Sequence, residues 1–333
     1  EALLAIPSGH VTTYSEIAAA IGGNANADFT CNGVAFDSRE IGEGDLFFAL
    51  KGEVSDGHKY LEQTYTNGAA GAVVSEETNR PHVRVGDTAK ALNELAAASR
   101  KRSSAKIIGV TGSAGKTGTK EALFAALDRS SRGYAHRSVK SYNNHVGVPL
   151  SLARMPTSSK FGIFEMGMNH PGELSALTKL VKPDVAIVTT IAPAHIGFFK
   201  DELEIATAKA EIFEGLRPGG SAIIPADSPH YNQLRKAAER HTAHIVSFGF
   251  NASADVRVID YVPSGDGGWL ITAQLPGGAI CYSLSQPGKH WIANSLAVLA
   301  AVEAVGGDLA AAGSALAELD GLTGRGARHQ VSI

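Results

Sequence analysis

The sequence predicts an α/β protein with a mostly parallel central sheet and a smaller antiparallel sheet. Short apolar runs are repeatedly followed by a loop and then by a helical pattern, and many of the 37 glycines stand at the ends of these runs. Within residues 255–285, Gly-Gly pairs separate alternating stretches, which indicates antiparallel strands. With 333 residues, the chain is long enough for two domains with separate cores.

Composition excludes several classes of protein. Basic and acidic residues number 30 and 33, so a nucleic-acid footprint over the whole surface is not expected. No apolar run approaches the length of a membrane span, and the first residues do not resemble a signal peptide. Cys31 and Cys281 are far apart and lack metal-ligand spacing, which favours two buried, reduced cysteines of a cytoplasmic protein and leaves a disulfide open.

The N-terminal third predicts a small domain of short strands and helices. Ser15 is the expected N-cap of a first helix that Gly22 ends. The further elements are strands at 45–50 and 71–75 and helices at 60–67 and 89–101. A polar stretch after the last helix predicts the boundary, giving domains 1–104 and 105–333.

A polar triplet, Asp37-Ser38-Arg39, follows an apolar strand of this first domain. It has a structural interpretation as an Asx-capped turn. It also has a functional one, because Ser38 and Arg39 suit a nucleotide base or a diphosphate. The loop residues 51–52 and 56–58 would lie near the triplet if these strands share a sheet.

The strongest local motif follows the apolar strand at 107–110. It consists of Gly112, Ser113, Ala114, Gly115, Lys116, Thr117 and Gly118. Small residues let backbone N–H groups surround a phosphate, the following helix directs its positive end at the same place, and the lysine adds a charge. Thr117 offers a hydroxyl to Mg²⁺. The loop is shorter than G-x-x-x-x-G-K-[ST], since Val110 replaces the first glycine, so a plain strand-to-helix turn stays open.

Polar residues end later strands of the second domain. Because ligands bind beyond the carboxyl ends of parallel strands, Lys116, Glu165 and His195 are expected at one edge. A carboxylate at Glu165 suits magnesium, since burial is otherwise costly. His195 is equally explained as a polar strand cap. Lys209 adjoins the apolar face of its helix, and its alternative interpretation is a snorkelling lysine with its ammonium in solvent. A cationic lysine would not bind a metal ion.

Several blocks in register resemble the Mur ligases, the ATP-dependent amide-forming enzymes of peptidoglycan synthesis. They are TGSAGKT, YNNHVGVPLSL, EMGMNHPGEL, IAPAH, AKAEIFEGL, PGKHWIANSLAVLAA and GRGARH, and the resemblance covers about residues 12–333. Within the family, GVAFDSREIGEGDLFFALKG, DGHKYL and EMGMNHPGEL look most like the members that add D-alanyl-D-alanine.

The resemblance implies site roles residue by residue. Lys116 and Thr117 would hold the γ-phosphate of ATP and a Mg²⁺ that Glu165 also binds. His195 would bind a second Mg²⁺ together with Lys209. For this role Lys209 would be a carbamate, which supplies an anionic oxygen. The nucleotide and substrate contacts would include Asn294 on adenine, Arg325 on the phosphates, and Ser38, Arg39 and Asn144 along the UDP-sugar path. Trp291 stands where the family block has an asparagine, which puts the adenine contacts there in question.

The implied reaction joins D-alanyl-D-alanine to UDP-N-acetylmuramoyl tripeptide through an acyl phosphate, in cell-wall synthesis that supports cell shape and division. The resemblance also implies a first domain that binds the UDP substrate, a central ATP-binding domain, and a protein that is a monomer in the cytoplasm. Family members carry a third, Rossmann-like domain after the point where this sequence ends, so we expect the printed chain alone to bind substrate with little or no ligase activity. Another Mur-type or folylpolyglutamate-type ligase, or a non-catalytic nucleotide-sugar-binding module, stays open.

Overall fold

A computed structural model describes residues 12–52, 55–193, 199–265 and 267–319. The chain divides into two compact units. Unit 1 combines Glu1–Ala105 with Ser138–Ser159, and unit 2 combines Lys106–Arg137 with Lys160–Ile333. The sequence analysis did not foresee that 138–159 joins unit 1, where helix α5 (Gly147–Ala153) packs against α3 (Thr88–Arg102).

Unit 1 is built on a mixed sheet with strand order β2-β7-β6-β5-β4. Strands β4 to β7 are parallel, and β2 is antiparallel to β7. The bounds are β2 Asn24–Ala25, β4 Gly33–Ala35, β5 Asp45–Phe48, β6 Gly71–Val74 and β7 His82–Arg84, and a separate antiparallel pair joins β1 Thr12–Thr13 to β3 Thr30–Cys31.

Both faces of this sheet are covered, because side chains along β5 alternate between them. Leu46 and Phe48 join a core cluster with residues of α1 (Tyr14–Ile21) and α3. Phe47 packs on the other side, where Leu61 and Tyr65 come from α2 (Leu61–Thr66), which follows the 3₁₀ helix η2 (Gly57–Tyr60). The near-continuous apolar run of β5 therefore reflects burial on both faces.

The start of α1 differs from the expectation. Thr13, and not Ser15, is the N-cap, and its backbone N–H donates to Glu16 Oε2 over 3.1 Å. A threonine followed three residues later by glutamate forms a capping box, which moves the helix start towards the N-terminus. Gly22 ends the helix as predicted, with φ of 63° in the left-handed region.

The two cysteines are both free, as expected, but differ in exposure. Cys31 is buried, and desolvation, with the Asp45 carboxylate adding to it, raises the pKa of its thiol to about 12. Cys281 is exposed, so the prediction that it is buried was wrong. It lies on β16, whose burial alternates along the strand.

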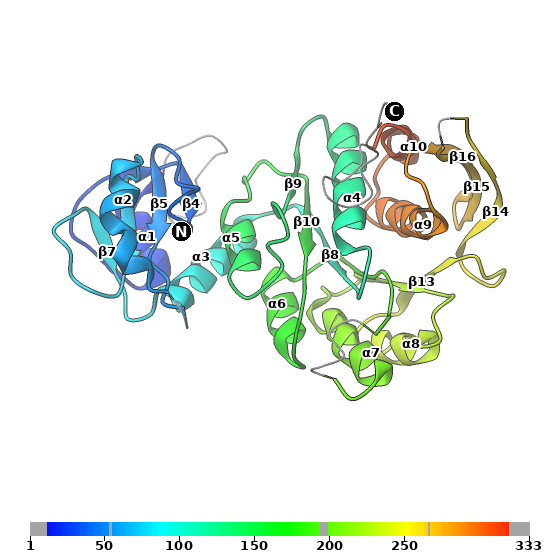
Figure 1. The fold of residues 1–333 in the computed structure, drawn as a ribbon, viewed down its shortest axis with the longest axis horizontal. Helices are drawn as coiled ribbons and strands as arrows, with labels where there is room; N and C mark the ends of the chain where they lie inside the picture. Colours follow the sequence, from blue (N-terminus) through cyan, green and yellow to red (C-terminus); the bar gives the residue numbers. More distant parts are fainter. Residues whose placement is uncertain (1–11, 53–54, 194–198, 266, 320–333) are drawn as a thin grey trace, which may run out of the picture. The chain divides into compact units, whose positions relative to one another are not determined.

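Unit 2 contains a long sheet with strand order β16-β15-β14-β13-β12-β11-β8-β10-β9 (Figure 1). Pairs from β9 to β14 are parallel, and β14, β15 and β16 pair antiparallel. The bounds are β8 Lys106–Thr111, β9 Ala135–Arg137, β10 Phe161–Glu165, β11 Val185–Val188, β12 Ser221–Pro225, β13 His244–Gly249, β14 Val256–Pro263, β15 Trp269–Leu275 and β16 Gly278–Leu284. The predicted α/β class, with parallel and antiparallel parts, is confirmed.

Helices cover both faces of the parallel part (Figure 1). One side carries α4 (Lys116–Ser131), α9 (Lys289–Ala304) and α10 (Leu309–Ala317), and the other carries α6 (Glu173–Val181), α7 (Glu202–Ala210) with η4 (Glu211–Gly215), and α8 (Tyr231–Ala238). No helix in the described ranges is long and apolar enough to cross a membrane.

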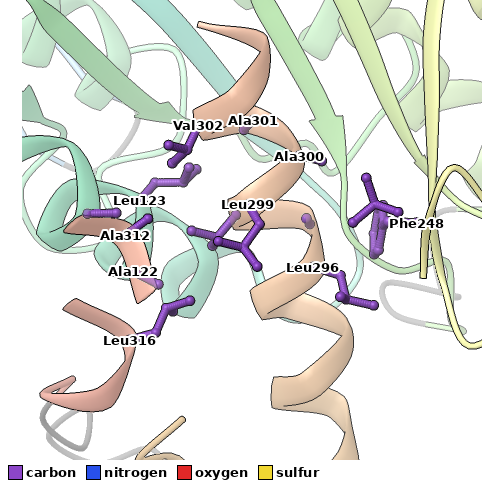
Figure 2. Packing of buried hydrophobic residues seen from close by; sticks show 14 of the residues in the cluster. Ala122, Leu123, Phe248, Leu296, Leu299, Ala300, Ala301, Val302, Ala312 and Leu316 are labelled. Carbon is purple, nitrogen blue, oxygen red and sulfur yellow. The ribbon is translucent and has the colours of Figure 1, made fainter. Parts of the chain in front are cut away.

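The main core of unit 2 lies where α4, α9 and α10 meet the sheet. Figure 2 shows Leu123 of α4, Leu299 of α9 and Leu316 of α10 pointing into one cluster, with Phe248 of β13 beside α9. Alanines occupy several of the other core positions on these helices, which lets the helices pack closely there. This packing fixes α9 against the phosphate-loop helix α4.

Candidate active site

The glycine-rich loop between β8 and α4 has the backbone that its sequence predicts. Gly112 and Gly115 both have positive φ, 151° and 83°, and α4 starts at Lys116. A Cβ atom on Gly112 would overlap Thr189 Oγ1, so the loop requires glycine there. The N-terminus of this 16-residue helix directs a partial positive charge at the loop.

The residues that follow β11 hold this loop in place. Thr189 Oγ1 donates to the carbonyl of Ala114 over 2.6 Å. The N–H of Ser113 donates to Thr190 O (2.7 Å), while its hydroxyl donates to Ala192 O (2.9 Å) and accepts from Ala192 N–H (3.1 Å). Ser113, expected among the phosphate ligands, therefore uses its N–H and hydroxyl to anchor the loop.

Lys116 folds back over its own loop. Its ammonium Nζ donates to the carbonyl of Gly112 over 2.7 Å. The side chain therefore already lies along the loop at which a phosphate would bind. A cation at this position attracts phosphate oxygens, and the adjacent helix N-terminus adds to the attraction.

Glu165 ends β10 beside the loop strand. Its register partner on β8 is Val110, and only 1% of Glu165 is exposed. The Nζ of Lys120, one helical turn after Lys116, lies 3.6 Å from Glu165 Oε2. The structure thus places the predicted carboxylate next to α4, and it adds a buried lysine that the sequence analysis did not select.

Lys209 of α7 is buried, so the snorkelling interpretation was wrong: 2% of the residue is exposed. Desolvation lowers the pKa of Lys209 to about 7, and repulsion from Lys116 contributes in the same direction. Two lysines from different helices therefore share this part of unit 2. A lysine with this pKa is partly neutral at pH 7.

The first turns of α9 pack against the phosphate loop and α4. The amide of Asn294 would lie 3.0 Å from a Cβ on Gly115, and the Trp291 ring would lie 2.7 Å from a Cβ on Gly118. Both side chains are largely buried. Asn294 thus lies at the loop, and Trp291 fills the space beside Gly118.

His195 and Arg325 lie outside the described residues. Thr117 follows Lys116 in the first turn of α4. Among the described residues, no group of three or more His, Cys, Asp or Glu side chains could hold a metal ion.

Unit 1 contains a cavity of about 770 Å³, and Ser38, Arg39 and Asn144 all contribute to its lining. Gly52 and Gly57 also line it, so the two loops expected near the triplet do lie there. Asn144 Oδ1 accepts the N–H groups of residues 146 and 147 (3.2 and 2.9 Å) at the start of α5. The triplet and the 141–146 segment, far apart in sequence, thus form one cavity.

Ion pairs order the rim of this cavity. Arg39 donates to Asp37 through Nε and Nη2 (2.9 and 2.6 Å), and this pairing lowers the pKa of Asp37 to about 2. Glu40 accepts from Lys140 and from Tyr142 Oη (2.8 Å). Lys140 and Tyr142 gave no signal in the sequence, because only the fold brings them to the triplet.

Comparison with known proteins identifies the family. Residues 110–302 match the Mur ligase middle domain, and residues 30–101 match the catalytic domain of the Mur ligase family. The chain belongs to the Mur ligase family. The matched stretches contain the phosphate loop, Glu165, Lys209 and Asn294, as well as the Ser38–Arg39 pair, so the resemblance seen in the sequence blocks is confirmed.

Individual Mur ligases support this membership. The chain is 34% identical over 312 residues to a UDP-N-acetylmuramoyl-tripeptide–D-alanyl-D-alanine ligase of Rickettsia prowazekii, covering 92% of the chain and 69% of that protein. It is 35% identical to the Escherichia coli ligase of the same name, covering 90% of the chain and 66% of that protein. The chain thus spans about two thirds of the length of these relatives.

Solved structures of Mur ligases have the same fold. MurF from Acinetobacter baumannii aligns with a TM-score of 0.84 and 31% identity, over 95% of this chain and 70% of the other. MurF ligase from Thermotoga maritima in complex with ADP aligns with a TM-score of 0.73 and 27% identity, over 87% and 66% of the two chains.

Proposed function

We propose that the protein is an ATP-dependent ligase that adds D-alanyl-D-alanine to UDP-N-acetylmuramoyl tripeptide, in cytoplasmic peptidoglycan precursor synthesis. The observation that carries the proposal is a set of three charged groups, the half-buried Lys116 and the buried Glu165 and Lys209, near a glycine-rich phosphate loop in a Mur ligase chain. Relatives with this named activity align over most of the chain.

Magnesium fits the donor set at the loop. Mg²⁺ is commonly bound through one or two carboxylates together with phosphate oxygens and water. Glu165 offers the carboxylate at the end of β10, and Thr117 offers a hydroxyl in the first turn of α4. We assign these two residues to a metal that, when bound, neutralises phosphate oxygens.

Lys209 suits a carbamate. The fraction of its amine that is neutral near pH 7 can form an N–C bond to carbon dioxide, with loss of one proton. The product is an anionic oxygen ligand, which removes the repulsion between two neighbouring cations. This carbamate and His195 would be our candidates to hold a second Mg²⁺, which would neutralise further phosphate charge.

The nucleotide would lie along the loop. Backbone N–H groups around Gly115 and the Lys116 ammonium would bind the β- and γ-phosphates. Asn294, packed on Gly115, is our candidate for a contact to adenine, and Arg325 for one to the phosphates. Trp291 takes up the space beside Gly118 and would leave less room there than an asparagine.

These groups account for the proposed reaction. The tripeptide carboxylate attacks the γ-phosphorus of ATP, so that an O–P bond forms and ADP leaves. Lys116 lowers the barrier, because it offsets the repulsion between the nucleophile and the phosphate oxygens. The D-alanyl-D-alanine amine then attacks the acyl carbon, and the tetrahedral intermediate collapses to the amide and inorganic phosphate, with loss of one proton.

The cavity of unit 1 is our candidate site for the UDP-sugar. Arg39 is 83% exposed at its side chain and is oriented by Asp37, which leaves further guanidinium donors for a diphosphate. Ser38 and the amide of Asn144 would add polar contacts. Phe36 and Tyr142, with ring centroids 5.6 Å apart, supply an aromatic wall.

Calorimetry with UDP-N-acetylmuramoyl tripeptide, and with a folate in parallel, tests the substrate class. We expect saturable binding of the UDP tripeptide that Arg39→Ala weakens, and no binding of folate. Folate binding instead would support a folylpolyglutamate-type ligase. Phosphate release that depends on both tripeptide and D-alanyl-D-alanine would separate a ligase from a nucleotide-sugar-binding module, and failure to bind the UDP tripeptide would overturn the proposal.

A further inference from the structure

Lys120 is a fully buried lysine for which the proposed reaction has no role. It lies in the second turn of α4, and 0% of the residue is exposed. Its Nζ lies 3.6 Å from Glu165 Oε2 and 3.2 Å from Glu121 Oε1. Lys116 and Lys120 are four residues apart on one helix, so they lie on the same side of α4.

The two carboxylates around Lys120 differ in their surroundings. Glu121 is also bonded by Arg137, whose Nε lies 2.8 Å from Glu121 Oε2, and its side chain is 22% exposed. The Glu165 side chain is 1% exposed, so water cannot replace a lost cation there. Loss of the Lys120 charge would therefore act on Glu165 at a place that water hardly reaches.

Burial of a lysine in this place is costly. An ammonium group that leaves water loses solvation free energy on the order of several kcal/mol. A neutral residue of similar volume often packs as well or better. The contact to Glu165 offsets this cost and restricts where the carboxylate can point. Stability alone is thus a weak reason for a lysine at this position.

We propose that Lys120 is a positioning residue, which holds the Glu165 carboxylate in place at the phosphate loop and balances its charge until a divalent cation arrives with the nucleotide. This inference rests on the proposed role of Glu165 as a metal ligand. Residues that orient a metal ligand typically change metal affinity by about 10- to 100-fold when they are replaced.

Manganese binding provides a direct readout. Mn²⁺ would be titrated into the protein with ADP and followed by electron paramagnetic resonance, for wild type, Lys120→Met, Glu165→Gln and the double variant. We expect Lys120→Met to weaken Mn²⁺ binding about 10-fold or more. If Lys120 acts through Glu165, adding Lys120→Met to Glu165→Gln should weaken binding no further.

Other variants keep the test decisive. Glu121→Gln should leave Mn²⁺ affinity close to wild type, and Lys120→Arg should retain part of it because the charge remains. If Lys120→Met does not fold, the comparison of Glu165→Gln with the double variant still applies, since neither of these variants leaves the Glu165 carboxylate buried without Lys120. Wild-type affinity in Lys120→Met, or a further loss in the double variant, would overturn the inference.

The same titration separates this inference from the proposed function. If wild type and Glu165→Gln bind Mn²⁺ with ADP equally well, the metal assignment of Glu165 fails first. If Glu165→Gln weakens binding while Lys120→Met does not, only the role of Lys120 fails.

Discussion

Charged side chains have different surroundings at two places in the molecule. In unit 2, Lys120, Glu165 and Lys209 are almost completely buried around the phosphate loop. In unit 1, pairs such as Lys51–Glu76 and Arg80–Glu62 stay largely in solvent. The same residue types therefore have different consequences, because burial strengthens electrostatic interactions that water would screen.

This difference points to where the chemistry takes place. Transfer of a phosphoryl group requires fixed charges that need not reorganise during the reaction. The buried groups of unit 2 meet that requirement, whereas the Arg39–Asp37 and Lys140–Glu40 pairs of unit 1 order the rim of a cavity. Substitutions should therefore affect catalysis most in unit 2 and affect binding in unit 1.

The largest effect is expected for Lys116→Ala. Because this ammonium lies over the phosphate loop, its loss should reduce ATP-dependent acyl-phosphate formation about 100-fold or more. Acyl phosphate can be trapped with hydroxylamine and counted. The control is Lys106→Ala, since Lys106 is an exposed lysine at the start of β8. Equal loss in both variants, or none in Lys116→Ala, would remove the assignment.

A packing change tests the contact between α9 and α4. In Gly118→Ala, the new methyl group would lie 2.7 Å from the buried Trp291 ring, which is closer than van der Waals contact allows. We expect a loss of about 1–3 kcal/mol in the free energy of unfolding, as for other overpacked cores.

Denaturant unfolding measures this loss, and Trp291→Phe should recover part of it in the double variant. Ala is a better helix former than Gly by about 1 kcal/mol, so a net gain in stability would show that the ring moves aside at little cost.

Lys209 should make the stability of unit 2 depend on pH. Its pKa is about 7 in the folded protein and near 10.5 when unfolded, so between these values the unfolded state binds more protons. Wild-type stability should therefore rise with pH from about 7 to 10.5. Lys209→Met removes this dependence and should be more stable than wild type, most clearly at or below pH 7, by on the order of a few kcal/mol.

Urea unfolding in buffers free of carbon dioxide, between pH 6.5 and 9.5, measures the difference. Lys236→Met is the control, because Lys236 is exposed on α8. Parallel pH curves for wild type and Lys209→Met would contradict the shifted pKa.

The sequence predicted the elements of the site better than their surroundings. The phosphate loop and the end of β10 follow from local patterns of glycine and apolar residues, with Lys116 at the start of α4 and Glu165 at the last position of β10. The burial of Lys120 was missed, because a lysine beside a glutamate in a helix has the pattern of an exposed face. It is buried because α4 packs on β10, a contact between segments that are distant in sequence.

Long-range packing also explains the other differences. Asn294 was selected through a family block, but its contact with Gly115 depends on how α9 packs against α4. The unit 1 cavity needs the triplet at 37–39 and the segment at 141–146, and no local pattern joins these two stretches. Local propensity predicts helices and strands, while the partners of a side chain depend on the tertiary fold.

The smallest effect is expected for an exposed ion pair of unit 1. Lys51 Nζ lies 2.7 Å from Glu76 Oε1, but the two side chains are 53% and 61% exposed. Water and salt screen such a pair, and fixing two long side chains costs entropy. Lys51→Met should leave the midpoint of thermal unfolding unchanged within error at about 0.15 M salt, which is close to physiological ionic strength. A clear decrease in this midpoint that persists in about 1 M salt would show that solvent exposure does not distinguish weak charge pairs from strong ones. The contrast between the units would then have to rest on geometry alone.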